Sequence, residues 1–290
     1  MRDRGHKTLP IRESIRESYV FFSSHFLHFL RLATPILLLW IIVDIFEVYI
    51  EQSRGVRPDL NFIISFLSAG FSLVWYRLFI SGPEDATYWG MLTHHFRGRS
   101  KSSAMAVFRS VTRLILLTVA ILVPTLLLSI MLMLFLTRQG AIMTPELIRQ
   151  MVFLAMGVAF LLLSPVLARI SLYTVSFVLG RKSLQMRDVW RQTRGYTLPL
   201  WGILMRAFLP YALLVRYSEP LLEHLSLQWG LTGFGQAAFI TLPVAFLSLM
   251  MLAIMVGANA EAFRKLIGMR EGDAPHRPTA GPKRTAETAF

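Results

Sequence analysis

Residues 236–258 read QAAFITLPVAFLSLMMLAIMVGA, a stretch with no charged side chain. A helix rises about 1.5 Å per residue, so a run of this length spans the roughly 30 Å hydrocarbon core of a bilayer. Five further apolar runs of similar length occur, although Arg206 interrupts the last of them. They cover 33–50, 60–80, 113–137, 150–168 and 198–215. The sequence therefore predicts an all-α, polytopic membrane protein with six transmembrane helices.

The composition of the whole chain agrees with this prediction. Of its 290 residues, 54% are hydrophobic and 16% are charged, whereas soluble domains carry about a quarter charged residues. The chain has no cysteine, which excludes disulfides, thiolate metal sites and cysteine nucleophiles.

The positions of the basic residues orient the predicted helices. Lys and Arg accumulate in cytoplasmic loops, and all but five of the 30 lie in the N-terminal segment, the second and fourth loops and the C-terminal tail. The five exceptions are Arg54, Arg57, Arg138, Arg149 and Arg216. Both ends are therefore expected on the cytoplasmic side of a plasma membrane. The net charge of +13 is explained by anionic lipid head groups as partners, with no need for nucleic acid.

Three parts of the chain differ in composition. Residues 1–32 form a basic amphipathic segment, 33–265 the six-helix domain, and 266–290 a cytoplasmic tail expected to be disordered because it cannot bury a core. The loop at 216–236 is expected to be the longest outer connection, with a short helix on the surface.

A proline recurs in the odd-numbered runs, as Pro35, Pro124 and Pro210, each after a basic amphipathic stretch. This pattern favours three successive helical hairpins, each preceded by an interfacial amphipathic helix. A proline in a helix leaves a backbone carbonyl without its partner, which neighbouring groups must satisfy inside a membrane.

Asp44 and Glu47 are candidate intramembrane acids, because they lie three residues apart on one helix face with Glu51 one turn further. Carboxylates inside membranes are costly and often functional. Their position near the outer leaflet leaves two alternatives open, a solvated or Arg-paired structural role and a proton or cation site. Asp59 is expected to cap the second helix.

Residues 180–197 read as a basic amphipathic helix on the cytoplasmic face. Leu184, Val189 and Trp190 are expected to face lipid. The candidate lipid or partner contacts are Arg187, Trp190, Arg191 and Arg194. One interpretation is a surface anchor, and the other is a specific site for a lipid head group or a docking partner.

Catalytic, cofactor and metal sites are not expected. His25 and His28 are three residues apart and His94 and His95 are adjacent, but neither pair has a carboxylate in a metal-ligand motif. No phosphate loop, nucleophile elbow or zinc-protease motif is present in the sequence.

Two stretches carry a family resemblance. The segment VWYRLFISG at 74–82, and RISLYTV at 169–175 together with WRQTRG at 190–195, resemble a loose group of uncharacterised bacterial six-helix inner-membrane proteins. That group is similar in pattern to the membrane domain attached to some glycerophosphodiester phosphodiesterases. The resemblance implies six helices and a bacterial plasma (inner) membrane, and it implies no activity.

The function favoured by the sequence is that of a non-catalytic accessory acting through lipid or protein partners. A small-molecule or lipid transporter is the alternative, motivated by the prolines and by Asp44 and Glu47. An enzyme ranks third, because acids, histidines and nucleophiles are not clustered at one depth.

Overall fold

The computed structural model describes residues 11–56, 58–83, 86–89, 112, most of 123–138, 144–178 and 184–268. Within these residues every regular element is a helix. The helices are α1 (Ile11–Ser24), α2 (Phe26–Arg54), α3 (Asn61–Ser81), α6 (Pro145–Val178), α7 (Met186–Gln192), α8 (Thr197–Gln228) and α9 (Gly233–Leu266).

Four helices combine the length and apolar composition needed to cross a membrane, namely α2, Phe62–Ile80 within α3, α8 and α9. Two shorter apolar stretches, Leu126–Phe135 and Leu161–Val175, overlap the third and fourth predicted spans. Residues 113–122 of the third span lie outside the described residues, as do 1–10 and most of the predicted tail, from 269 onward. The all-α, membrane-embedded class is thus confirmed.

The connection between α8 and α9, which the sequence placed outside the membrane, is much shorter than predicted. α8 continues through Pro220 to Gln228, so residues 229–232 alone join the two helices. A turn closes the connection, with the Leu231 amide donating to the Ser226 carbonyl at 2.9 Å. The expectation of a long outer loop with a separate surface helix is wrong, because the apolar periodicity fades before the helix ends.

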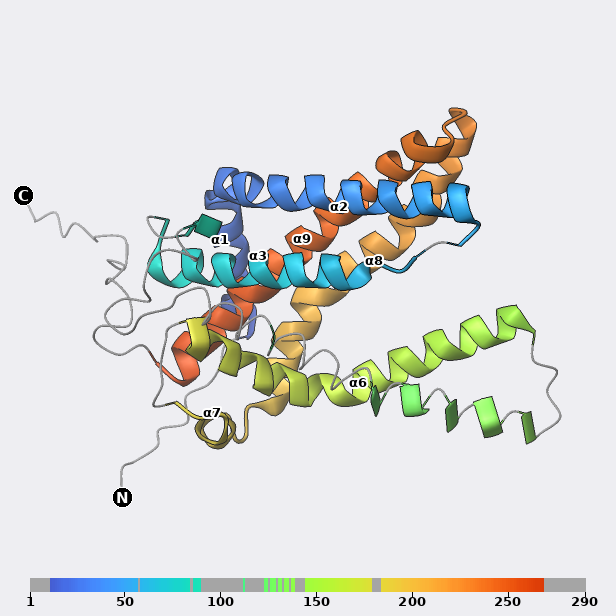
Figure 1. Cartoon of the computed structure of the whole chain (residues 1–290). Helices are drawn as coiled ribbons and strands as arrows, with labels where there is room; N and C mark the ends of the chain where they lie inside the picture. The colour runs from blue at the N-terminus through green and yellow to red at the C-terminus, as the bar shows by residue number, and fades with distance from the viewer. Residues whose placement is uncertain are drawn as a thin grey trace, which may run out of the picture.

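The packed core lies at one end of the bundle. In Figure 1 the helices converge at the end where α3, α6 and α9 finish and where α2 and α8 begin, and they separate toward the other end. We call the convergent end the inner end. Phe29, Phe71 and Trp75 are fully buried there, with Phe29 and Phe71 each about 5.9 Å from the Trp75 ring. Toward the other end, large apolar side chains such as Leu38, Ile42 and those along α8 are exposed.

α1 packs across α8 and α9 at the inner end. Its buried face includes Ser14 and Ser18, and the Ser18 hydroxyl donates to the Ile254 carbonyl of α9 at 2.7 Å. A Cβ placed on Gly257 would lie 2.5 Å from Ser18 Oγ. Small residues permit such close helix contacts, so Gly257 provides the space that α1 occupies.

A proline lies inside α6, and neighbouring side chains compensate for the backbone hydrogen bond that it removes. Pro165 has no amide hydrogen, so the Leu161 carbonyl loses its usual helical partner. The Ser164 hydroxyl donates to that carbonyl at 3.0 Å and accepts from Trp201 Nε1 of α8 at 2.7 Å. One buried serine therefore satisfies this carbonyl and joins α6 to α8.

Candidate functional site

Most buried polar side chains in the described residues gather at the inner end. In an apolar environment each such group is costly unless it is hydrogen-bonded or paired. Their positions therefore indicate where specific polar contacts hold the helices together. The set near the inner end comprises Ser14, Ser18, Arg77, Arg169, Thr193 and Glu261.

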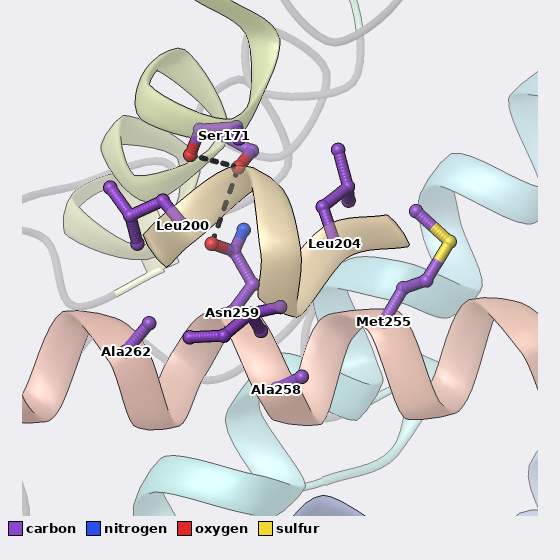
Figure 2. A pocket seen from close by; sticks show the side chains of 9 residues that line it. Ser171, Leu200, Leu204, Met255, Ala258, Asn259 and Ala262 are labelled. Atoms are coloured by element: carbon purple, nitrogen blue, oxygen red, sulfur yellow. Dashed lines mark hydrogen bonds between the residues drawn. The ribbon is translucent and has the colours of Figure 1, made fainter. Parts of the chain in front are cut away.

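A chain of hydrogen bonds joins α3, α6 and α9 at this end. The Asn259 side chain donates through Nδ2 to the Tyr76 hydroxyl at 2.7 Å and accepts through Oδ1 from the Ser171 hydroxyl at 3.2 Å. Figure 2 shows Asn259 pointing from α9 toward Ser171 of α6. Since each residue belongs to a different helix, these bonds fix the relative register of the three helices.

A small pocket lies beside this chain of hydrogen bonds, with Ser171 and Asn259 as its polar members (Figure 2). Its other walls are apolar and include Leu200, Leu204 and Met255. The volume open to the centre of a water-sized sphere is about 10 Å³, which is room for about one water molecule. The pocket is too small to hold a metabolite in this conformation.

The chemistry of this cluster is neutral hydrogen bonding. Hydroxyl and amide groups can bind a water or position a helix, whereas acid–base catalysis needs a group that titrates near the working pH. Among the described residues, no three His, Asp or Glu side chains are close enough together to hold a metal ion.

Arg169 connects α6 to α7 and to the turn before α8. Its Nε donates to Thr193 Oγ1 at 3.0 Å, its Nη2 donates to the Trp190 carbonyl, and its guanidinium carbon lies 3.6 Å from the Trp190 ring centroid. The Thr193 hydroxyl in turn donates a hydrogen bond to the Val189 carbonyl of α7 at 2.8 Å. Arg169 is only 8% exposed, and its hydrogen bonds to Thr193 and Trp190 hold α7 in place.

The four predicted contact residues lie in α7 and in the turn that follows it. Arg187, Trp190 and Arg191 are at positions i, i+3 and i+4 of α7, which places them on one helix face, and Arg194 lies in the turn after the helix end. All four are exposed, and Trp190 is 41% exposed although Arg169 lies over its ring. We call these four residues the α7 face.

The opposite side of α7 differs from the sequence expectation. Leu184 and Val189, which were expected to face lipid, are buried in the protein core. The helix is also shorter than predicted, because it begins at Met186 and ends at Gln192. The amphipathic pattern was correct, but α7 uses its apolar side to dock on α6, and the basic side remains outward.

The two candidate acids lie at helix contacts near the outer end of α2. Asp44 Oδ2 accepts a short hydrogen bond from the Thr241 hydroxyl of α9. Glu47 Oε1 accepts from the Leu60 amide at 2.8 Å, at the start of α3. Leu60 is the N-cap residue of α3 and its side chain makes no cap hydrogen bond, so Glu47 ties α2 to the residue where α3 begins.

Near the end of α9 lies a buried acid, Glu261, that was not predicted from the sequence. Glu261 is 1% exposed and pairs with Arg264 at 2.9 Å and with Lys265 at 3.5 Å. Lys265 also pairs with Glu13 of α1 at 3.1 Å. The spacing of Glu261 to its two partners, i+3 and i+4, was a readable signal, but the contact to α1 depends on the fold.

Two further residues complete the inner end. Tyr88, in the segment after α3, donates to the Leu32 carbonyl of α2 at 2.9 Å. Burial raises the pKa of the Tyr88 hydroxyl further above neutral pH, which favours its protonated, hydrogen-bond-donating form. His25 lies at the corner between α1 and α2, with its ring stacked on Phe21 at 4.2 Å and Nδ1 2.9 Å from Ser24 Oγ. These contacts are structural ones between neighbouring elements.

In the described residues these features define an all-helical protein with helices suited to a membrane, whose buried polar side chains join the helices at one end of the bundle. Comparison of the chain with known protein families, with curated proteins and with solved structures found no match.

Proposed function

We propose that the protein is a non-catalytic accessory of the bacterial plasma membrane that acts through lipid or protein partners engaged at its cytoplasmic end. In this proposal the chain crosses the membrane six times, with the inner end and both termini in the cytoplasm. The distribution of Lys and Arg supports this orientation, because the outward α7 face belongs to a loop rich in basic residues.

The arrangement of the helices supports the proposed three hairpins. α1 and α2 both pack against α9, and α7 and α8 both pack against α6. An amphipathic helix and the long helix after it thus contact the second helix of another hairpin in both cases. This shared relation is expected if the chain repeats one unit of an amphipathic helix followed by a hairpin.

The observation that carries the accessory function is the closed inner end. The Tyr76, Asn259 and Ser171 side chains bond to one another, and the pocket beside them admits about one water. A carrier needs a polar path or cavity near the membrane centre. Asp44, the acid that motivated a transporter, is engaged by Thr241 as a contact between α2 and α9.

Native mass spectrometry of the full chain in mild detergent tests this function. We expect lipids or a protein to remain bound at defined stoichiometry. In parallel, the chain reconstituted in vesicles should show no proton-linked flux, and the Asp44→Asn variant should behave like the unaltered protein. Reproducible flux that Asp44→Asn abolishes would refute the accessory function and establish the transporter.

A further inference from the structure

The α7 face combines basic side chains and an aromatic side chain on an exposed surface. Arg187 and Arg191 lie on the same side of this two-turn helix as Trp190, and Arg194 lies in the turn that follows it. Arginine binds phosphate through several donors of its planar fork, and indole rings are enriched where lipid head groups meet the hydrocarbon. The combination matches the boundary between a phosphate layer and an apolar layer.

This face is held in place from behind. Arg169 bonds to the Trp190 carbonyl and to Thr193, and its guanidinium covers one side of the indole. At the start of α7, the Gln185 amide donates to Asp188 Oδ2 at 3.2 Å in a capping box. A surface that is already ordered loses less conformational entropy when it binds.

The charge balance of the face also favours an anion. Asp188 is the acidic residue of α7, and it is engaged by the capping box and by Arg191 at 3.3 Å. The remaining arginines of the face, Arg187 and Arg194, add two positive charges to this pair. The α7 face therefore keeps a net positive charge after its internal ion pair is counted.

The surroundings of α7 indicate a membrane surface. Residues 193–196 alone separate α7 from α8, which begins a candidate membrane span at Thr197. Leu198 in the first turn of α8 is 72% exposed, and Met186 at the start of α7 is also exposed. Exposed apolar side chains so close to the arginines are expected where hydrocarbon meets head groups.

We propose that the α7 face binds the phosphate head groups of anionic phospholipids in the cytoplasmic leaflet, and that Arg169 and Thr193 are positioning residues that hold this face toward the lipid. The proposal rests on the accessory function above and narrows its partner to a lipid. A soluble phosphate shares the same chemistry, and a protein would be a different partner, so the experiment must separate the three.

The test is lipid competition, measured by native mass spectrometry of the full-length protein in detergent with equal amounts of phosphatidylglycerol and phosphatidylcholine. The variant Arg187→Gln/Arg191→Gln/Arg194→Gln removes the three charges of the face. A matched control removes three exposed arginines elsewhere, as Arg54→Gln/Arg138→Gln/Arg216→Gln.

We expect the unaltered protein and the control to retain phosphatidylglycerol in preference to phosphatidylcholine. At roughly fivefold per well-placed arginine, the triple variant of the face should lose at least tenfold of this preference. Equal losses in both triple variants, or no loss in either, would overturn the proposal. If the triple variant does not fold, the single variants Arg187→Gln and Arg194→Gln should each lose roughly fivefold of the preference for phosphatidylglycerol. No loss of this preference in either single variant would overturn the proposal.

Two added measurements identify the source of the phosphate. Inorganic phosphate at millimolar concentration should leave lipid retention unchanged; if it displaces the lipid and itself remains bound, the face is a soluble-anion site and the lipid proposal fails. A protein held at the face without lipid would also refute the proposal while leaving the accessory function intact. Proton-linked flux, by contrast, would refute the accessory function itself.

The positioning role has its own readout. Arg169→Gln should reduce the preference for phosphatidylglycerol, and Arg169→Lys should restore part of it, because lysine keeps the charge near Trp190 while losing the two-pronged contact. Both variants remove part of the packing, so a purely structural role predicts lower thermal stability with the lipid preference unchanged. That outcome would show that Arg169 does not position the face.

Discussion

Replacing Gly257 with alanine tests how α1 is held on the bundle. The added Cβ would lie 2.5 Å from Ser18 Oγ, whereas ordinary contact begins near 3.4 Å, so the two atoms must separate by about 0.9 Å. The serine cannot simply rotate at no cost, because its hydroxyl donates to the Ile254 carbonyl. Ser18 Cβ at 3.3 Å and Phe79 at 3.4 Å also leave little room.

The expected cost follows from these contacts. Rotating Ser18 loses a buried hydrogen bond, which costs about 1 to 3 kcal/mol when the donor is left unsatisfied. Moving α1 instead gives an overpacking penalty of about the same size. Alanine favours the helix over glycine by about 1 kcal/mol, but α9 stays helical whether or not α1 is docked. For the docking of α1 alone, we therefore expect a loss of about 2 kcal/mol.

The absence of cysteine from the chain provides a clean assay. Ser14 lies on the buried face of α1 and is fully buried, so Ser14→Cys introduces one thiol that a maleimide reaches only when α1 opens. A loss of about 2 kcal/mol corresponds to roughly thirtyfold faster labelling in the Gly257→Ala background. Adding Ser18→Ala to the Gly257→Ala variant should slow the labelling part of the way back, because it removes the atom nearest to the new Cβ.

Gly70→Ala is the matched control, since a Cβ at that helical position meets no atom within 4 Å. Labelling of Ser14→Cys should be as slow in this control as in the unaltered background. If Gly257→Ala labels no faster than Gly70→Ala, the proposed contact between α1 and α9 does not hold α1 in place.

Three further changes test other contacts. Ser164→Ala should lower the thermal unfolding temperature more than Trp201→Phe. The alanine variant leaves both the Leu161 carbonyl and the Trp201 indole N–H without a partner, at about 1 to 3 kcal/mol, whereas the phenylalanine variant leaves Ser164 bonded within α6. The reverse order of the two unfolding temperatures would contradict this role of Ser164. Asp44→Asn should unfold at nearly the same temperature as the unaltered protein, since its amide oxygen can accept from Thr241, while Thr241→Val should cost about 1 kcal/mol. Asn259→Ala removes two interhelical hydrogen bonds and should cost about 2 kcal/mol in a detergent denaturation series, and a change below 0.5 kcal/mol would show that these bonds are not needed.

The sequence predicted the helices where their composition changes sharply at the ends. The run at 60–80 matches α3 at Asn61–Ser81, because polar residues and glycine lie on both sides of it. α8 was predicted to end near 215 but reaches Gln228. The residues beyond 215 are more polar, and a helix end depends on hydrogen bonds and packing that the apolar pattern does not record.

The candidate site was predictable only in part. The basic amphipathic pattern of residues 180–197 predicted the residues of the α7 face, and the structure leaves those side chains exposed. The sequence did not reveal that Thr241 would bond to Asp44, 197 residues away, or that Asn259 would join Tyr76 and Ser171. Such pairs are set by the register between helices, and single-helix periodicity carries no information about that register.

The convergence of the helices at one end bears on how the protein fits bilayers of different thickness. α9, with 34 residues, is about 51 Å long, well beyond a hydrocarbon layer of about 30 Å. Many apolar side chains of the separated ends are exposed and not packed on other described helices, so these ends can change their tilt while the core keeps its contacts. Adjusting tilt costs fractions of a kcal/mol per ångström of mismatch, which lets one chain remain folded as membrane thickness varies with lipid composition.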